Sequence, residues 1–340
     1  MKNIKTYNLY LVISTFTRNI IDLYSVVYLY KLGFNVNNII LVYTIIFLLG
    51  ILISYLSLKI GNALGYKYIL IFSSIITSIS FYILKNSTNL FLIAIFLSLS
   101  IHTYHPVKHY YGMNLLKEKN IISKSILLVF ISSFIASYFV IKEINNLYLI
   151  IISIIGIIPT LYIKKEPKKE IIYKKIDRSK IKYFILDQTR VLFLLFEPLY
   201  LFIVANKISF VGTFNIVITI SSILYLYFIS NKLNLEKNYK YINIFFVIIL
   251  ILKLNIKNKI FLLIIAFFEG IGLKTNEVVS THMLYKDKTS LGYLIKSETI
   301  FLLTKSIILL IIYIFKIKLV IFMYLLLIGV FLLSFKYKKR

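Results

Sequence analysis

The feature that most constrains this chain is a series of long apolar stretches, separated by short links rich in lysine and asparagine. Each stretch holds about 18 residues or more, which is enough for a helix to cross a hydrocarbon layer of about 30 Å. Inside lipid the backbone must satisfy its own hydrogen bonds, so such stretches must be helical. A transmembrane barrel would need alternating apolar and polar residues, which these stretches lack. The sequence therefore predicts an all-α integral membrane protein.

The stretches predict twelve transmembrane helices and a long basic link after the sixth, at 164–180. The first stretch is too long for a cleavable signal peptide and carries Arg18 and Asp22. The ninth stretch is short and ends at Lys253. The expected spans are 7–30, 37–58, 68–84, 89–107, 121–141, 147–163, 181–204, 209–230, 240–253, 259–283, 291–315 and 319–335.

The distribution of lysine and arginine predicts the orientation of these helices. With the N-terminus in the cytoplasm, the inner segments carry roughly three times as many basic residues as the outer links, as the positive-inside rule requires. Both termini are therefore expected in the cytoplasm. The formal net charge of +27 would suggest nucleic acid as a partner of a soluble chain. Here the basic residues lie in the links of a chain that is 59% hydrophobic, so we expect no nucleic acid.

An internal repeat divides the chain. With a shift of 172 residues, Thr17–Arg18 falls on Thr189–Arg190, and Tyr28–Leu29 falls on Tyr200–Leu201. Chance matching in an apolar chain rich in isoleucine and leucine is the alternative explanation. Two halves that begin with the same kind of helix are a recurrent transporter plan. The expected domains are a six-helix bundle at 1–163, a cytoplasmic linker at 164–180, and a second bundle at 181–340.

Ionisable residues lie mainly within the first, fourth, seventh, tenth and eleventh helices. Such residues in a membrane are costly and mark function by default. Helices one, four, seven and ten are equivalent under a nested three-helix repeat, so they are expected to surround a polar substrate cavity. The cavity candidates are Arg18, Asp22, His102, His105, Asp187, Arg190, Glu197, Glu269, Lys274, Glu277 and Lys305. Lys108, His109 and Glu298 lie nearer the helix ends.

Spacing within the helices leaves several roles open for these residues. Arg18–Asp22 and Asp187–Arg190 are spaced to pair on one helix face, either within the cavity or as structural ion pairs. The histidines share one face, where they could serve as packing residues near the cytoplasmic mouth or as metal ligands. No carboxylates are suitably spaced beside them, so we expect no metal.

Three carboxylates are candidates for proton coupling. Glu197 and Glu269 have no obvious partner nearby in sequence, and a buried, unpaired carboxylate can carry a proton. Asp22 is the third candidate. Lys305 could neutralise one of these groups, which would then make the pair structural.

The chain resembles the major facilitator superfamily of transporters. The resemblance lies in LYKLGFNVNNIILVYTI at 29–45, KIGNALGYKYIL at 59–70 and IHTYHPVKHYYG at 101–112, and in the long link between the halves. Gly65 and Lys67 match the second glycine and the basic residue of the family's loop signature between helices two and three. Asn62 and Ala63 depart from it, because the family has an aspartate and an arginine there.

The resemblance implies two bundles around a cavity lined by helices one, four, seven and ten. The two bundles would rock around this cavity and so give alternating access. It implies a gating role for Gly65 and Lys67. It also implies a secondary active transporter of a small solute, with proton coupling as a candidate, in the plasma membrane. The mixed charges of the cavity candidates fit a small polar or zwitterionic solute, or an organic cation. We expect a monomer, surrounded by lipid.

Two other functions compete with this one. A twelve-helix flippase or exporter of lipid-linked sugars would carry an excess of basic residues in its cavity, whereas the candidates are mixed. A membrane-embedded enzyme would carry acids or histidines in loops at one membrane face, whereas the outer links are short and bland. No nucleophile elbow, phosphate loop or His-Glu-x-x-His motif is present. The chain has no cysteine, which excludes disulfides and thiolate metal sites, and we expect no enzyme activity and no cofactor.

Overall fold

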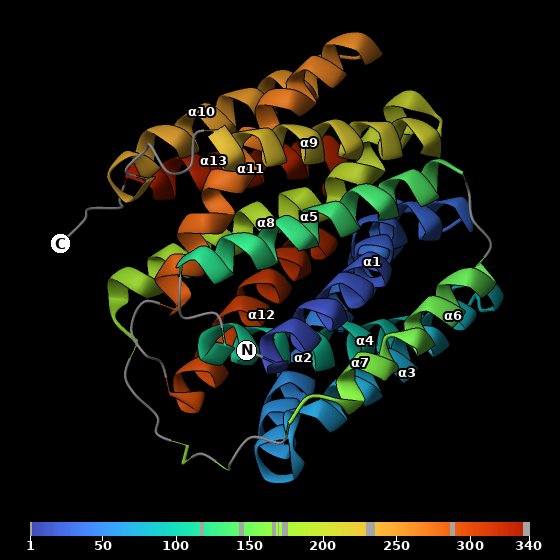
Figure 1. Ribbon diagram of the computed structural model, residues 1–340. Helices are drawn as coiled ribbons and strands as arrows, with labels where there is room; N and C mark the ends of the chain where they lie inside the picture. Colours follow the sequence, from blue (N-terminus) through green and yellow to red (C-terminus); the bar gives the residue numbers. More distant parts are fainter. Residues whose placement is uncertain are drawn as a thin grey trace. The chain divides into compact units, whose positions relative to one another are not determined.

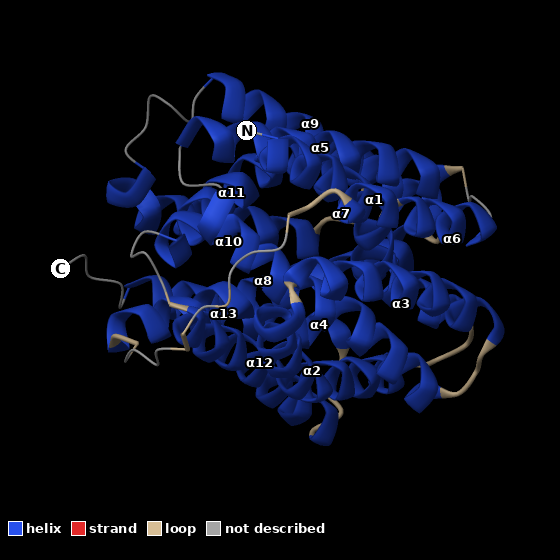
Figure 2. Cartoon of the chain, turned by 60° about the horizontal axis from the view of Figure 1, so that its bottom comes forward, coloured by secondary structure: helices blue, strands red, loops and turns tan. Residues whose placement is uncertain are grey.

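The computed structural model describes residues 2–115, 119–142, 146–164, 168, 170–171, 176–228, 235–285 and 290–335. These residues form thirteen α-helices and no strand (Figures 1 and 2). The helices are α1 Lys2–Lys31, α2 Val36–Leu64, α3 Tyr66–Asn86, α4 Leu90–Leu115, α5 Lys119–Ile141, α6 Asn146–Ile155, α7 Ile157–Leu161, α8 Arg178–Ala205, α9 Ile208–Phe228, α10 Leu235–Asn255, α11 Lys259–Tyr285, α12 Leu291–Ile314 and α13 Leu319–Phe335.

Each expected span contains a helix, with ends that differ by up to eight residues, as at the end of α4. In the described residues, six segments are long and apolar enough to cross a membrane, and four further apolar helices are shorter. The six segments are Val36–Leu64, Tyr66–Asn86, Leu90–Gly112, Lys180–Ala205, Ile208–Tyr225 and Leu291–Ile314. The protein is therefore an all-helical chain with several membrane-spanning candidates. The count of twelve spans and the placement of the termini stay predictions.

The sixth expected span corresponds to the apolar helical segment Leu147–Leu161, which is interrupted at one residue. The interruption is at Gly156, between α6 and α7. Pro159 is the physical reason, because it has no N–H to donate to the preceding turn and its ring clashes with that turn. After Pro159 the hydrogen bonds join residues three apart, as in a 3₁₀ turn: the Ile163 N–H donates to the Thr160 carbonyl at 3.1 Å. Pro106 and Pro198, by contrast, lie inside the continuous helices α4 and α8.

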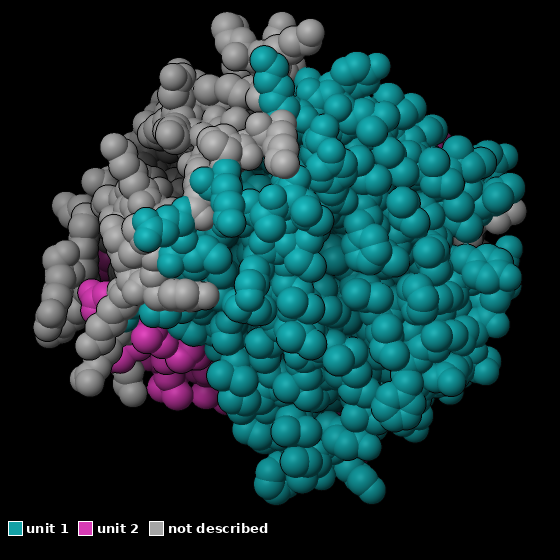
Figure 3. Space-filling view, turned by 90° about the horizontal axis from the view of Figure 1, so that it is seen from below, with its two compact units in different colours: residues 1–132, 144–176, 288–316 teal, residues 133–143, 177–287, 317–340 magenta. Residues whose placement is uncertain are grey.

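The chain divides into two compact units, which are coloured separately in Figure 3. Unit 1 comprises Met1–Ser132, Ile144–Ile176 and Lys288–Lys316, and unit 2 comprises Ser133–Glu143, Asp177–Asp287 and Ile317–Arg340. Unit 1 thus takes α12 from the second half of the sequence, and unit 2 takes the end of α5 from the first. The predicted division into bundles at 1–163 and 181–340 stays a prediction.

In unit 1, α2 packs against α4 and α12, and α3 packs against α4 and α6. The turn between α2 and α3 is a single residue, Gly65, with φ 121° and ψ 133°. A side chain would be strained at this φ, so the turn requires glycine. Next to it lies an aromatic cluster, in which Tyr66 stacks on Tyr110 with ring centroids 3.7 Å apart. Leu291 and Leu294 of α12 complete the same buried cluster.

In unit 2, α11 packs against α9 and α10, and α13 packs against α8 and α10. Two glycines of α11 bring these helices close together. A Cβ on Gly270 would lie 2.4 Å from the Ile218 carbonyl oxygen of α9, and a Cβ on Gly272 would lie 2.6 Å from the Phe246 ring of α10. Small residues at helix contacts let membrane helices approach in this way. The Ser222 hydroxyl adds a hydrogen bond to the Gly270 carbonyl at 2.9 Å.

Candidate functional site

Lys253 and Glu269, the two most deeply buried charged residues in the described part of the chain, form a triad with Glu197 in unit 2. The Lys253 ammonium of α10 donates to Oε1 of Glu197 on α8 and, at 2.7 Å, to Oε2 of Glu269 on α11. The exposed fraction is 0% for Lys253 and Glu269 and 5% for Glu197. The triad therefore joins three helices through charges that are shielded from solvent.

The surroundings of Lys253 fix its ammonium in place. The Phe193 and Phe214 rings lie 5.0 and 5.5 Å from Nζ, within reach of a cation–π attraction. The Tyr200 hydroxyl donates to the carbonyl oxygens of Lys253 and Leu254, at 3.3 and 3.1 Å. These carbonyls are at the end of α10, where the helix cannot supply donors of its own. The same end of the helix is thus capped from α8 and held electrostatically by two carboxylates.

Lys253 was not among the sequence candidates, because the ninth span was expected to end there. The helix in fact continues to Asn255, so Lys253 is a helical and buried residue. Lys253 is the residue that contacts Glu197 and Glu269, and neutralisation of one of the three carboxylates by Lys305 stays a prediction. The signal that could have identified Lys253 was its place at the end of a span that was too short to cross a bilayer.

Asp187 and Arg190 form the ion pair that their spacing predicts. Arg190 NH2 donates to Asp187 Oδ1 at 2.5 Å, and both side chains are largely buried. The neighbouring Gln188 amide also donates to Asp187, at 3.1 Å. This pair lies on α8, two turns before Glu197.

Arg18 lies inside unit 1 and is held by neutral groups of two neighbouring helices. Its NH1 donates to the carbonyl and, at 2.9 Å, to the hydroxyl of Ser100 on α4. Its NH2 donates at 2.5 Å to the hydroxyl of Ser73 on α3. The guanidinium carbon also lies 4.8 Å from the centre of the Tyr104 ring. A planar cation with five donors suits this arrangement, in which acceptors approach from two sides.

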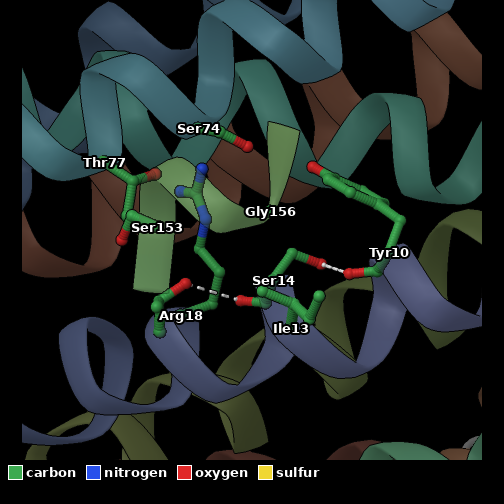
Figure 4. Close-up of a pocket in the computed structure, with 9 residues that line it drawn as sticks. Tyr10, Ile13, Ser14, Arg18, Ser74, Thr77, Ser153 and Gly156 are labelled. Atoms are coloured by element: carbon green, nitrogen blue, oxygen red, sulfur yellow. Dashed lines mark hydrogen bonds between the residues drawn. The ribbon is translucent and has the colours of Figure 1, made fainter. Parts of the chain in front are cut away.

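A polar pocket adjoins Arg18 (Figure 4). It is lined by residues of α1, α3 and α6 and by Gly156. In Figure 4 the Arg18 side chain extends from α1 toward Ser74 and Thr77 of α3. The space between these residues is about large enough for one water molecule, and far smaller than a pocket for a drug-sized ligand.

Replacement of Arg18 by lysine is expected to lower the apparent melting temperature of the purified protein. One ammonium cannot serve acceptors on both α3 and α4, and hydrogen bonds to charged groups contribute about 1.5–3 kcal/mol each. Ser100→Ala, which removes the hydroxyl and keeps the carbonyl acceptor, is expected to have a smaller effect. Thermal unfolding in detergent measures both. If Arg18→Lys melts as the unaltered protein does, these hydrogen bonds do not stabilise unit 1.

The histidines of α4 have separate surroundings. His102 is fully buried, its ring lies 6.0 Å from Phe47 of α2, and its Nε2 has no hydrogen-bond partner among the described residues. His105 is partly buried, 5.2 Å from the Tyr104 ring. His109 pairs with Glu298 of α12, whose Oε1 lies 2.5 Å from its Nδ1. In the part of the chain that is described, no three potential metal ligands come together.

Lys305, on α12, lies near this histidine face within unit 1. Its ammonium is 4.6 Å from the centre of the Phe47 ring. Phe47 also contacts His102, so α2, α4 and α12 contribute to one partly polar cluster. Sequence reasoning named Lys305 and His102, but it did not connect them.

The structure does not describe the side chains of three predicted site residues. They are Asp22 on α1 and Lys274 and Glu277 on α11. The expected Arg18–Asp22 pair therefore stays a prediction. Of the loop residues, Gly65 forms the one-residue turn between α2 and α3, and the half-buried Lys67 lies 5.1 Å from the Tyr68 ring.

Comparison with known proteins defines the class of fold. No protein-family model matches the sequence, and none of the curated proteins matches it. Among solved structures, the nucleoside transporter NupG is similar, with 14% identity and a TM-score of 0.66 over 99% of this chain and 98% of that chain. A bacterial homologue of the iron transporter ferroportin in an outward-facing state is similar at 10% identity, with a TM-score of 0.66 and the same coverage.

Both of these structures are transporters of the major facilitator fold, and the alignments run over nearly the whole of each chain. The present chain therefore has the major facilitator fold and is a membrane protein, as the sequence resemblance predicted. At 10–14% identity, the similarity shows the fold but does not identify the solute.

Proposed function

We propose that this protein is a secondary active transporter, which moves a small polar solute across the membrane by alternating access. The observation that supports this most strongly is the combination of a transporter fold with charges buried among apolar helices. Such charges are costly in a membrane and are kept where they bind solutes or ions. The Glu197–Lys253–Glu269 triad and the Arg18 site are the clearest examples among the described side chains.

The proposed topology has twelve spans with both termini in the cytoplasm, and bundles at 1–163 and 181–340 joined by the linker 164–180. One packing feature supports this duplicated plan. The fifth helix of the second half, α12, packs against α2, the second helix of the first half. Reciprocally, a Cβ on Gly212 of α9, the second helix of the second half, would lie 2.5 Å from Ile141 of α5. The protein would act in the plasma membrane as a monomer.

The substrate class is proposed from charge. The described buried groups include both cations and carboxylates, which suits a small polar or zwitterionic solute, or an organic cation. One similar structure is a nucleoside transporter and the other is a homologue of an iron transporter, so the fold accommodates chemically different cargo. Proton coupling through Asp22, Glu197 or Glu269 is part of the proposal.

A thermal-shift screen followed by transport assays tests this function. The purified protein would be screened against nucleosides, amino acids, sugars and organic cations, since a solute at about 100 times its Kd stabilises a protein by about 2.7 kcal/mol. Each hit would be assayed for uptake into proteoliposomes with and without a pH gradient. We expect saturable uptake that protein-free vesicles do not show. Hits that bind and are chemically altered rather than transported would contradict the proposal.

A further inference from the structure

We propose that Glu197, Lys253 and Glu269 form a binding site for one exchangeable proton. We further propose that this proton is the ion to which solute movement is coupled, a step that rests on the proposed function. The site lies wholly within unit 2 and is made by α8, α10 and α11.

The charge balance calls for a proton. Two carboxylates face one ammonium, so the fully ionised triad would carry a net charge of −1. Lys253 and Glu269 are wholly buried, and an uncompensated charge in such a place costs several kcal/mol. Two carboxylates that share a site cannot both stay ionised at low cost. One bound proton makes the triad neutral, with one ammonium, one carboxylate and one carboxylic acid.

Hydrogen bonding assigns that proton to Glu269. Its Oε2 accepts from Lys253 at 2.7 Å, while its Oε1 is buried and has no hydrogen-bond partner among the described residues. An ionised oxygen left without a donor is more costly than a neutral hydroxyl in the same place. Glu197 keeps its charge, because its Oε1 also accepts from Lys253 and it retains slight exposure. Binding forms one O–H bond at Glu269 and breaks none in the protein.

Among the described side chains, no other charged group contacts the triad. Tyr200 of α8 donates to backbone carbonyls, and Lys259 of α11 donates to the Ala205 carbonyl at 3.3 Å. Phe193 and Phe214 are apolar. The other charged or titratable residues with described side chains on the packed helices are Lys180, Lys182, Tyr183, Asp187 and Arg190 on α8, Tyr225 and Tyr227 on α9, Tyr241 on α10 and Tyr324 on α13.

The first test compares Glu269→Gln with the unaltered protein, since glutamine imitates a protonated carboxyl but cannot release a proton. Because the native state would hold one more proton than the unfolded state, stability should fall as pH rises, by up to tenfold in the unfolding constant per pH unit. Glu269→Gln should remove this dependence and keep the melting temperature near neutral pH. The exposed Glu170→Gln is the control and should leave the dependence unchanged.

Infrared difference spectra between acid and alkaline pH provide a second readout that requires no solute. The unaltered protein should show the band of one protonated carboxylic acid, and Glu269→Gln should lose it. If the band persists in Glu269→Gln, or if the pH dependence of stability is the same in both proteins, the proton site is overturned. If the proton is found and solute uptake still ignores an imposed pH gradient, the coupling role is overturned. Failure to find any transported solute would contradict the proposed function and leave both solute-free readouts standing.

Discussion

Replacement of Lys253 by methionine is expected to destabilise the protein more than any other single change of charge in unit 2. The substitution keeps most of the side-chain volume and removes the ammonium that holds Glu197 and Glu269 together. Breaking a buried ion pair in this way typically costs about 3–5 kcal/mol. The loss should be greatest at alkaline pH, because both carboxylates can be neutral only if each takes up a proton. Thermal unfolding in detergent and the yield of monodisperse protein measure the effect.

Lys257→Met is the matched control, since Lys257 follows the same helix but is exposed. It should leave the melting temperature nearly unchanged. A second arm combines Lys253→Met with Glu197→Gln and Glu269→Gln, which removes all three charges. Buried ion pairs replaced as a whole by neutral groups are often tolerated, so the triple variant should recover much of the loss. If Lys253→Met alone behaves as Lys257→Met does, the triad is not a stabilising unit.

Replacement of Gly270 by alanine is expected to separate α9 from α11. The new Cβ would lie 1.9 Å from the Ser221 hydroxyl and 2.4 Å from the Ile218 carbonyl oxygen. The hydroxyl can rotate away, but the backbone carbonyl of a packed helix cannot. Overpacking of this kind typically costs about 1–3 kcal/mol. The melting temperature should fall, and the adjacent Glu269 should be displaced from Lys253.

Gly329→Ala in α13 of the same unit is the comparison, because its Cβ would meet only Thr189 Cγ2, at 3.5 Å. This is ordinary van der Waals contact, so the variant should fold and melt normally. Adding Ser221→Ala to Gly270→Ala should not restore stability, since the clash with the Ile218 carbonyl remains. Full rescue by Ser221→Ala would show that the hydroxyl, and not the backbone, limits the approach of the two helices.

Several parts of this molecule could be predicted from sequence because they depend on local chemistry. An apolar run of bilayer length must be helical, so the expected span 291–315 matches α12 at Leu291–Ile314 closely. Because Asp187 and Arg190 are three residues apart on one helix, the sequence predicted the ion pair that the structure contains.

Contacts across helices could not be predicted in the same way, because nothing in a single sequence says which apolar faces meet. Glu197, Lys253 and Glu269 lie on three helices and are separated by 56 and 16 residues. The expectation that charges would concentrate on helices one, four, seven and ten therefore missed the ninth helix, which carries Lys253. Likewise the contacts of Arg18 with Ser73, Ser100 and Tyr104 on other helices could not be predicted from the sequence, and the Arg18–Asp22 pair stays a prediction.

The sequence by itself determined that this chain is a helical membrane protein and that it carries charges within its spans, since hydropathy and helical period are properties of local residues. Only the tertiary structure decided how those charges are balanced. The energy of a buried charge depends on the groups within a few ångströms, and these come from helices far apart in the chain. For that reason Lys253, the apparent end of a short span, is the centre of the proposed proton site.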